Sequence, residues 1–154
     1  MIYDSAESLH DLVLARLRFA GQRYTNGKRD IVELLVDAGH PVSIGDIAGR
    51  LPKMPRSSAY RHLVDLQQAG VVRRVVASDE FARFELAEEL TEHHHHLLCL
   101  QCGRVIDVMP GTSFETRLNK TVDQLAQAEG FLPQSHRLDV FGICVNCNRS
   151  LPIS

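Results

Sequence analysis

The stretch HHHHLLCLQCG, residues 93–103, joins four consecutive histidines to a C-x-x-C pair formed by Cys99 and Cys102. A second pair, Cys144 and Cys147, follows about forty residues later in the chain. Each pair lets two thiolates reach one ion, and two pairs supply the tetrahedral sulfur shell that zinc favours in structural sites. Redox-active pairs are a poorer interpretation, because a thioredoxin-like motif needs a βαβ setting. We therefore expect one structural zinc ion to join the two pairs.

The histidine run predicts further metal sites. If it is a β-strand, its side chains alternate, so that His94 and His96 face one side and His93 and His95 the other. Each pair could chelate its own ion, since neutral imidazole is a common ligand of zinc, iron(II) and nickel. Two histidines do not complete a site. The candidates for additional ligands are Glu85, Glu88, Glu89, Asp107, Glu115, His136 and His40.

The composition is that of a folded protein with two differently charged halves. Of the 154 residues, 44% are hydrophobic and 23% are charged, which excludes a disordered or fibrous chain. No apolar run approaches the roughly 18 residues of a membrane span, and the N-terminus does not resemble a signal peptide. We expect a cytoplasmic protein without a membrane partner. The net charge of −2 conceals +3 over residues 1–76 (11 basic, 8 acidic) and −5 over residues 77–154 (6 basic, 11 acidic).

The basic half predicts a winged helix-turn-helix domain. Apolar periodicity, capping residues and glycine or proline stops predict four helices, over residues 6–20, 25–38, 44–51 and 56–69. Two short β-rich runs, residues 71–76 and 81–86, flank a polar turn at residues 77–80 and predict a hairpin. Helices followed by such a hairpin favour a domain that places its fourth helix in the major groove of DNA.

Candidate DNA contacts gather at the start of that fourth helix. They combine guanidinium groups with hydroxyls, which suit phosphate oxygens and base edges; the residues are Arg56, Ser57, Ser58, Tyr60 and Arg61. Arg23, which precedes the second helix, is a further candidate. The alternative interpretation is a solvated helix start that is capped by Ser57, with Tyr60 packed in the core.

The acidic half predicts a small α/β domain. Residues 104–108 and 135–143 have strand patterns, and residues 114–128 have the pattern of a helix with Leu118, Val122 and Leu125 inward. Such a unit often dimerises, and a dimer suits a protein that reads two-fold operator DNA. The expected domains are a winged-helix domain at 1–86, a hinge at 87–92 and an α/β metal-binding dimerisation domain at 93–154. Phe19, Phe84, Phe131 and Leu138 are expected to pack against other side chains.

Several motifs resemble the ferric uptake regulator (Fur) family of bacterial metal-dependent transcription factors. They are Thr25, Lys28 and Ile31, then Ser58-Ala59-Tyr60-Arg61-His62-Leu63, HHHHLLCLQCGRVID, and His136 followed by Phe141-Gly142-Ile143-Cys144-Val145-Asn146-Cys147. The resemblance implies a homodimer of winged-helix domains hinged to α/β dimerisation domains, in which bound metal sets the arrangement that binds operator DNA. The expected protein is a repressor that controls metal homeostasis and is not an enzyme.

The resemblance also implies roles for individual residues. Cys99, Cys102, Cys144 and Cys147 match the structural zinc site. The regulatory site at the hinge is matched by His94, His96, Asp107, Glu85 and His40, with Glu88 and Glu89 as alternatives to Glu85. A further site within the dimerisation domain is matched by His93, His95, Glu115 and His136. The oxygen and nitrogen ligands favour iron(II) or manganese, and zinc accepts the same set.

The sequence departs from the family motifs at two places described here, and two alternative functions remain open. The fourth helix reads Ser-Ser-Ala-Tyr-Arg in place of a Thr-Val-Tyr-Arg type sequence, and Glu89 stands where zinc sensors have a cysteine. A peroxide-, manganese- or nickel-responsive regulator of the same family is one alternative. A constitutive DNA-binding protein with purely structural zinc is another. A zinc hydrolase or deaminase is disfavoured, because the sequence contains no H-x-E, H-E-x-x-H or P-C-x-x-C motif.

Overall fold

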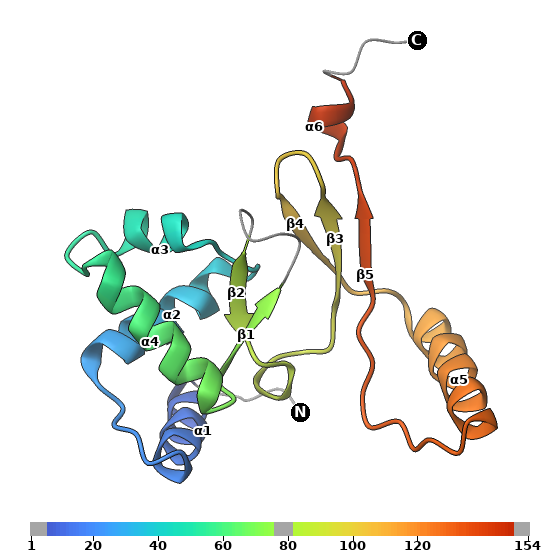
Figure 1. Ribbon diagram of the computed structural model, residues 1–154, viewed down its shortest axis with the longest axis horizontal. Coiled ribbons are helices and arrows are strands. Elements are labelled where there is room, and N and C mark those ends of the chain that lie inside the picture. The colour runs from blue at the N-terminus through green and yellow to red at the C-terminus, as the bar shows by residue number, and fades with distance from the viewer. Residues whose placement is uncertain (1–5, 76–81, 150–154) are drawn as a thin grey trace. The chain divides into compact units, whose positions relative to one another are not determined.

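The computed structural model describes residues 6–75 and 82–149 and divides the chain into two compact units, Met1–Glu92 and His93–Ser154. The first unit contains α1 (Ala6–Phe19), α2 (Asn26–Ala38), α3 (Ile44–Arg50), α4 (Arg56–Gln68), β1 (Val72–Val75), β2 (Arg83–Leu86) and the short 3-10 helix η2 (Glu88–Leu90) (Figure 1). The second contains β3 (His95–Cys99), β4 (Val105–Val108), α5 (Thr112–Ala128), β5 (Asp139–Gly142) and α6 (Val145–Asn148). The expected turn at 77–80 lies outside the described residues.

Local capping fixes where the helices of the first unit begin and end. The Thr25 hydroxyl accepts a hydrogen bond from the Lys28 amide at the start of α2, and Gly39 ends that helix with φ of 61°, a left-handed conformation that glycine adopts readily. Ser43 and Asp46 form a reciprocal capping box at the start of α3. These contacts satisfy backbone amides that would otherwise have no partner within the helix.

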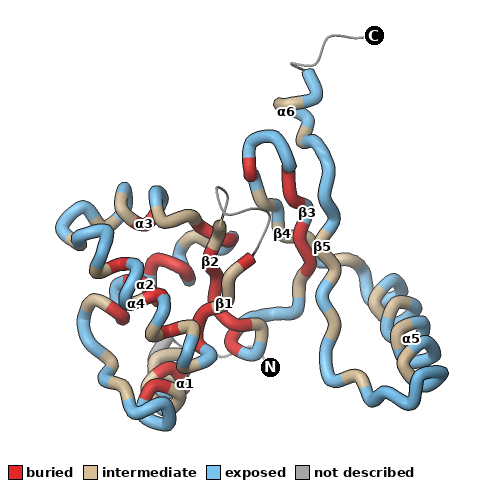
Figure 2. The backbone as a smooth tube through the Cα atoms, in the orientation of Figure 1, coloured by how far each residue is buried: buried red, intermediate tan, exposed pale blue. Residues whose placement is uncertain are grey.

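The helices of the first unit meet in one apolar core. Leu17 of α1, Ile31 of α2, Ile47 of α3 and Leu66 of α4 are all fully buried (red in Figure 2). Phe84 of β2 belongs to the same core, so the hairpin packs against the helices. Burial of this apolar surface is the main term that stabilises the unit.

The hairpin is the wing that the sequence predicts. β1 and β2 pair antiparallel, with Val72 opposite Leu86 and Arg73 opposite Glu85. Val42, just before α3, adds an antiparallel bridge to Phe84, with backbone hydrogen bonds of 2.8 and 2.9 Å. Helices α2 to α4 followed by this hairpin form a winged helix-turn-helix domain.

The second unit is built on a three-stranded sheet in the order β4-β3-β5. β3 lies in the centre and pairs antiparallel with β4 and parallel with β5. β4 and β5 lie on opposite sides of β3, and α5 stands between them in the chain. The two C-x-x-C pairs follow β3 and β5, so the parallel pairing of these strands places both at the same end of the sheet.

Three expectations about packing are wrong. Phe19 is 98% exposed and Phe131 is 67% exposed, whereas Phe84 is buried as expected. Leu125, expected to point inward from α5, is 67% exposed, and none of the α5 residues, all of which the structure describes, is buried. Leu118 and Val122 are half-buried. The apolar stripe on α5 therefore has no complete cover within the described chain.

The region expected to be the hinge, residues 87–92, includes η2. Leu90 within it is buried and belongs to the core of the first unit. The boundary between the two units follows Glu92. Among the described residues, no helix is both long and apolar enough to cross a membrane.

Candidate metal centres and DNA-binding helix

Four cysteines meet at one end of the three-stranded sheet. One sulfur from each of Cys99, Cys102, Cys144 and Cys147 lies within 4.8 Å of the other three, and all four are free thiols. The Sγ atoms of Cys102 and Cys144 are 3.8 Å apart. Tetrahedral zinc with Zn–S bonds of about 2.3 Å requires sulfur separations of about 3.8 Å. The donor set and its spacing therefore fit a structural zinc ion.

Hydrogen bonds from backbone amides favour the thiolate form of one cysteine in this cluster. The Cys144 amide donates to Cys99 Sγ at 3.3 Å. Hydrogen bonds from the amides of Cys144, Cys102 and Gln101 lower the pKa of the Cys99 thiol to about 6, which favours the thiolate that binds zinc. A hydrogen bond with the Cys144 side chain, together with burial, raises the pKa of Cys147 to about 12. Without a cation, four packed thiols cannot all ionise.

A second cluster joins the histidine run to α5 and to the segment before β5. His93, His95, Glu115 and His136 each offer one ligand atom within 4.8 Å of the others. Glu115 lies in the centre: its Oε1 is 2.5 Å from His95 Nε2, and its Oε2 is 3.5 Å from His136 Nε2. The His136 Nε2 atom is buried and makes no hydrogen bond to the described residues. A divalent cation would satisfy this nitrogen, so the donor set fits a nitrogen- and oxygen-ligated metal.

A third cluster lies on the face of the sheet that carries His96. The Nε2 atoms of His94 and His96 each lie 3.8 Å from an oxygen of Asp107, one on each oxygen. The two rings meet edge to face, with centroids 5.0 Å apart. His96 is 1% exposed. One ion can contact atoms at this spacing, because metal–ligand bonds of about 2.1 Å allow ligand separations up to about 4.2 Å.

The candidate ligands from the first unit have partners within that unit. Glu85 is buried on β2, and its Oε1 lies 2.5 Å from Arg73 Nε. The same guanidinium lies 3.2 Å from Glu88, so both carboxylates share one cation. Glu89 is 3.9 Å from Arg16. His40 lies before α3, and its Nδ1 is 3.0 Å from the Pro41 carbonyl.

The first turn of α4 presents its polar side chains to solvent. Arg56, Ser57, Tyr60 and Arg61 are exposed, and Ser58 is half-buried. Arg23, between α1 and α2, is also exposed. The residue that caps α4 is Pro55, and no side chain caps the helix. The alternative of a Ser57 cap with Tyr60 in the core is wrong, because Tyr60 is 50% exposed. Exposed cationic and hydroxyl side chains here can reach phosphates and bases.

Two polar contacts of these sites were not anticipated from the sequence. Arg73 neutralises Glu85 across the hairpin, and Asp139 hydrogen-bonds the buried ring of His96 at 2.9 Å. Strand register is the signal that finds them: Arg73 pairs with Glu85, and His96 pairs with Asp139. The sequence contains both residues, but it does not state the register.

A winged-helix domain joined to a small sheet unit with a four-cysteine centre and two histidine-rich clusters defines a metal-dependent DNA-binding regulator. A model of the ferric uptake regulator family matches residues 19–141, and the chain belongs to this family. It is a metal-responsive transcription regulator, and its cofactors are a structural zinc ion and a regulatory divalent metal ion. Members of this family bind DNA and act as dimers.

Known proteins similar to the chain include regulators of peroxide responses. The chain is 29% identical over 147 residues to the peroxide operon regulator of Bacillus subtilis, covering 91% of this chain and 95% of that protein. It is 30% identical over 139 residues to the peroxide-responsive repressor PerR of Staphylococcus epidermidis, covering 87% of each. The ferric uptake regulator of Helicobacter pylori has the same fold, with a TM-score of 0.72 at 24% identity over 94% of this chain and 95% of that one.

Proposed function

We propose that the chain is a repressor that binds operator DNA as a metal-loaded homodimer in the cytoplasm and has no enzymatic activity. In this proposal Cys99, Cys102, Cys144 and Cys147 hold the structural zinc, and His94, His96 and Asp107 form the nucleus of the regulatory site. The observation that carries the proposal is the spacing in the third cluster, where two imidazole nitrogens each lie 3.8 Å from Asp107. This arrangement accepts a divalent cation without a change in the register of the sheet.

Ligands from the winged-helix domain would make the regulatory metal a link between DNA binding and metal supply. We assign this role to Glu85 and His40, with residues 87–92 as the hinge. The coupling can be no larger than the difference in metal affinity between the two arrangements of the domains, typically about 1 to 3 kcal/mol per site. Glu85 already pairs with Arg73, so a metal ion bound by Glu85 must displace this counter-ion or share the carboxylate with it.

Operator DNA would meet the first turn of α4. The proposed contacts are Arg23, Arg56, Ser57, Ser58, Tyr60 and Arg61, whose exposure is described above. The charge of +3 over residues 1–76 favours an anionic partner, and two such domains in a dimer double this attraction.

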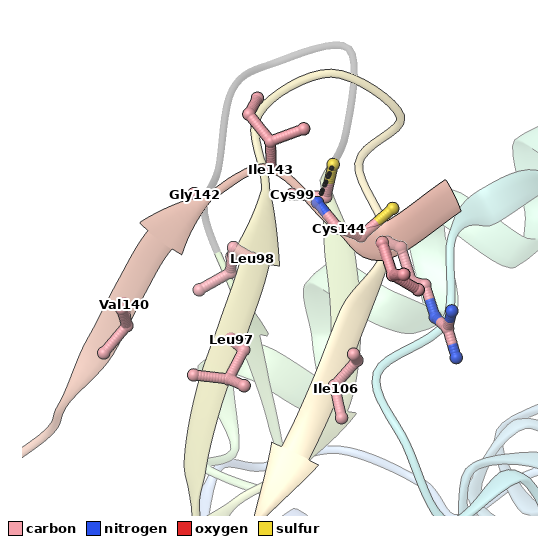
Figure 3. A pocket seen from close by; sticks show the side chains of 10 residues that line it. Leu97, Leu98, Cys99, Ile106, Val140, Gly142, Ile143 and Cys144 are labelled. Atoms are coloured by element: carbon pink, nitrogen blue, oxygen red, sulfur yellow. Dashed lines mark hydrogen bonds between the residues drawn. The ribbon is translucent and has the colours of Figure 1, made fainter. Parts of the chain in front are cut away.

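The second unit supplies a surface for dimerisation. Ile106, Leu97 and Val140 lie side by side on β4, β3 and β5, and each is between 37% and 46% exposed. Together with Ile143 and Val145 they line an apolar hollow on the sheet (Figure 3). The apolar stripe of α5 is a second uncovered surface of the same unit. A homodimer would remove these side chains from water.

The experiment that tests the proposal is operator binding by zinc-loaded protein, titrated with iron(II), manganese(II) or zinc. Metal should raise the affinity, and the double variant His94→Ala/His96→Ala should lose this dependence while it keeps the four-thiolate zinc. His10→Ala is the matched control, because His10 hydrogen-bonds Tyr24 within the first unit and belongs to neither histidine cluster. Metal-dependent binding that survives in the double variant would contradict the proposal. Replacing Glu85, Glu88 and Glu89 singly by Gln identifies which of them ligates.

A peroxide-responsive regulator is the second candidate function. The named functions of the Bacillus and Staphylococcus relatives favour it, and the histidine and carboxylate ligands suit iron(II). Iron(II) can reduce peroxide, whereas zinc has no redox chemistry of its own. Peroxide should then release DNA from the iron-loaded protein and leave the zinc- or manganese-loaded protein bound. Equal behaviour of the iron- and manganese-loaded forms would contradict this candidate.

A further inference from the structure

The imidazole of His96 lies between two carboxylates of the three-stranded sheet. The register pairs His96 with Asp107 on β4 and with Asp139 on β5. Directly paired residues of neighbouring strands project from the same face of a sheet, so the three side chains form one row. His96 is 1% exposed, and neither carboxylate is fully exposed. The register alone thus brings a second acid, Asp139, to the proposed regulatory site.

The two nitrogens of the His96 ring have different partners. Nδ1 lies 2.9 Å from Asp139 Oδ1, which is a hydrogen-bond distance. Nε2 lies 3.8 Å from Asp107 Oδ1, which is too long for a hydrogen bond and short enough for one ion to contact both atoms. One side of the ring is therefore bonded within the protein, and the other faces the cation position.

Asp139 is itself held in place. Its other oxygen, Oδ2, lies 3.4 Å from a guanidinium nitrogen of Arg137. An ionised carboxylate accepts hydrogen bonds and cannot donate one. The Oδ1 atom is thus available as an acceptor for the Nδ1–H group of His96.

We propose that Asp139 is a positioning residue for the regulatory metal. By accepting the Nδ1 proton of His96, it selects the tautomer in which Nε2 carries the lone pair that binds metal. The negative charge of Asp139 also makes Nε2 a stronger donor to a cation. The inference rests on the proposed regulatory site, and it adds a residue that does not contact the metal but sets the orientation and protonation of one that does.

The test is metal affinity in two Asp139 variants. Manganese(II) binding to zinc-loaded protein is measured by electron paramagnetic resonance, in a His136→Ala background that removes one ligand of the other histidine cluster. Asp139→Ala should weaken binding by about 10- to 100-fold, the effect typical of losing such an acceptor. Asp139→Asn should weaken it as well, because the amide lacks the negative charge and its NH2 group can donate to Nδ1, which places the ring proton on Nε2. Asp123→Ala is the matched control, since Asp123 is an exposed carboxylate of α5.

A second readout does not require the regulatory metal. Nitrogen-15 NMR of zinc-loaded protein, at a pH well above the usual histidine pKa of about 6.5, reports which ring nitrogen of His96 carries the proton. Wild type should show the proton on Nδ1, and Asp139→Ala should show it on Nε2 in part or in full. A purely structural role for Asp139 would not change the tautomer while the fold and the zinc content remain intact.

The outcomes separate this inference from the proposed function. If His94→Ala abolishes manganese binding while Asp139→Ala binds like the Asp123→Ala control and keeps the Nδ1 proton, the role of Asp139 is overturned and the site stands. If His94→Ala has no effect on manganese binding, the regulatory site itself fails. If Asp139→Ala does not fold, Asp139→Asn is the deciding variant: manganese binding equal to that of the Asp123→Ala control would overturn the inference.

Discussion

The first unit buries apolar side chains from four helices and a hairpin, whereas the buried side chains described in the second are Leu98, Cys99, His95 and His96 (Figure 2). Two of these four are imidazoles and one is a thiol. Burial of polar and ionisable groups is costly unless they are paired or bind a metal. The winged-helix unit therefore gains its stability from the hydrophobic effect, and we expect the sheet unit to depend on bound ions and on the proposed dimer surface.

This contrast gives metal sensing a physical basis. A unit with a complete core keeps its shape when the metal concentration changes, which is useful for a surface that must match DNA. A unit whose buried groups are ligands changes its stability with ion supply, because an ion that binds only the folded form shifts the equilibrium by mass action. We expect the response to metal to begin in the second unit.

The largest expected effect is loss of the four-thiolate centre. Cys102→Ser or Cys144→Ser should prevent the second unit from reaching its folded form, because the zinc joins the segments that follow β3 and β5 and the unit has little apolar core. The first unit should keep its melting transition. Calorimetry and limited proteolysis distinguish unfolding of the first unit from unfolding of the second. Gln101→Ala is the control, because Gln101 is an exposed residue between Cys99 and Cys102. A variant that retains an ordered second unit without zinc would show that the sheet is stable alone.

The complementary variant removes core volume from the first unit. Leu63 of α4 is 1% exposed, and Leu63→Ala should lower the free energy of unfolding of this unit by about 2 to 5 kcal/mol, from lost burial and the cavity that remains. Val64, its neighbour in the sequence, is 47% exposed, so Val64→Ala should change the stability by no more than about 0.5 kcal/mol. Urea unfolding followed by circular dichroism measures both. A zinc content that falls together with the stability of Leu63→Ala would contradict independent units.

The same contrast explains how far the sequence alone could predict the structure. Apart from the short η2 and α6, the helices and strands of both units follow from periodicity, caps and glycines; for example, Ser43 caps α3 as expected. Burial was predicted best in the first unit, where the chain completes its own core, although Phe19 of α1 is 98% exposed. Leu125 and Phe131 were expected to pack, but each side chain is 67% exposed, so the described chain does not cover it. Pattern shows which side chains are apolar, and it does not show whether this chain or another molecule covers them.

The site residues also divide into those that local sequence spacing predicts and those that it does not. Spacing in the sequence finds the cysteine pairs, because two thiolates separated by two residues reach one ion by local geometry. Alternation along a strand separates His94 and His96 from His93 and His95, and the structure places the two pairs in different clusters. Asp139 and Arg73 are brought to these residues by strand register, a long-range property that local pattern does not encode.

A smaller effect is expected where α2 approaches α4 in the first unit. A Cβ atom on Gly27 would lie 2.5 Å from Nε2 of His62, so Gly27→Ala forces the ring to move. We expect a loss of about 1 to 3 kcal/mol in unfolding free energy, typical of overpacking, and its recovery in the double variant Gly27→Ala/His62→Ala. Gly49→Ala in α3 is the control, because its Cβ meets nothing within 4 Å and alanine favours a helix. A Gly27→Ala protein as stable as the wild type would mean that His62 has room to turn.

The smallest expected effect is at the capping box of α3, and it depends on pH. Burial alone would raise the pKa of Asp46, but hydrogen bonds from the Ser43 amide and hydroxyl outweigh it and lower that pKa below its usual value. Because the pKa is lower in the folded state, the stabilisation is complete above the unfolded pKa of about 3.9 and is lost as the pH falls through the folded value.

Replacing Asp46 by Asn should therefore destabilise the first unit at neutral pH by about 1 kcal/mol, typical of a lost cap, and should have little effect at the acid end. The measurement is the difference in unfolding free energy between wild type and Asp46→Asn in urea, from pH 7 down to pH 3. Ser43→Ala should give a loss of similar size at neutral pH, since it removes the other half of the box. A difference that grows as the pH falls would contradict the sign of the pKa shift and remove the cap as its cause. The zinc-binding thiols lie in the second unit, so the pH dependence of metal binding need not coincide with this transition.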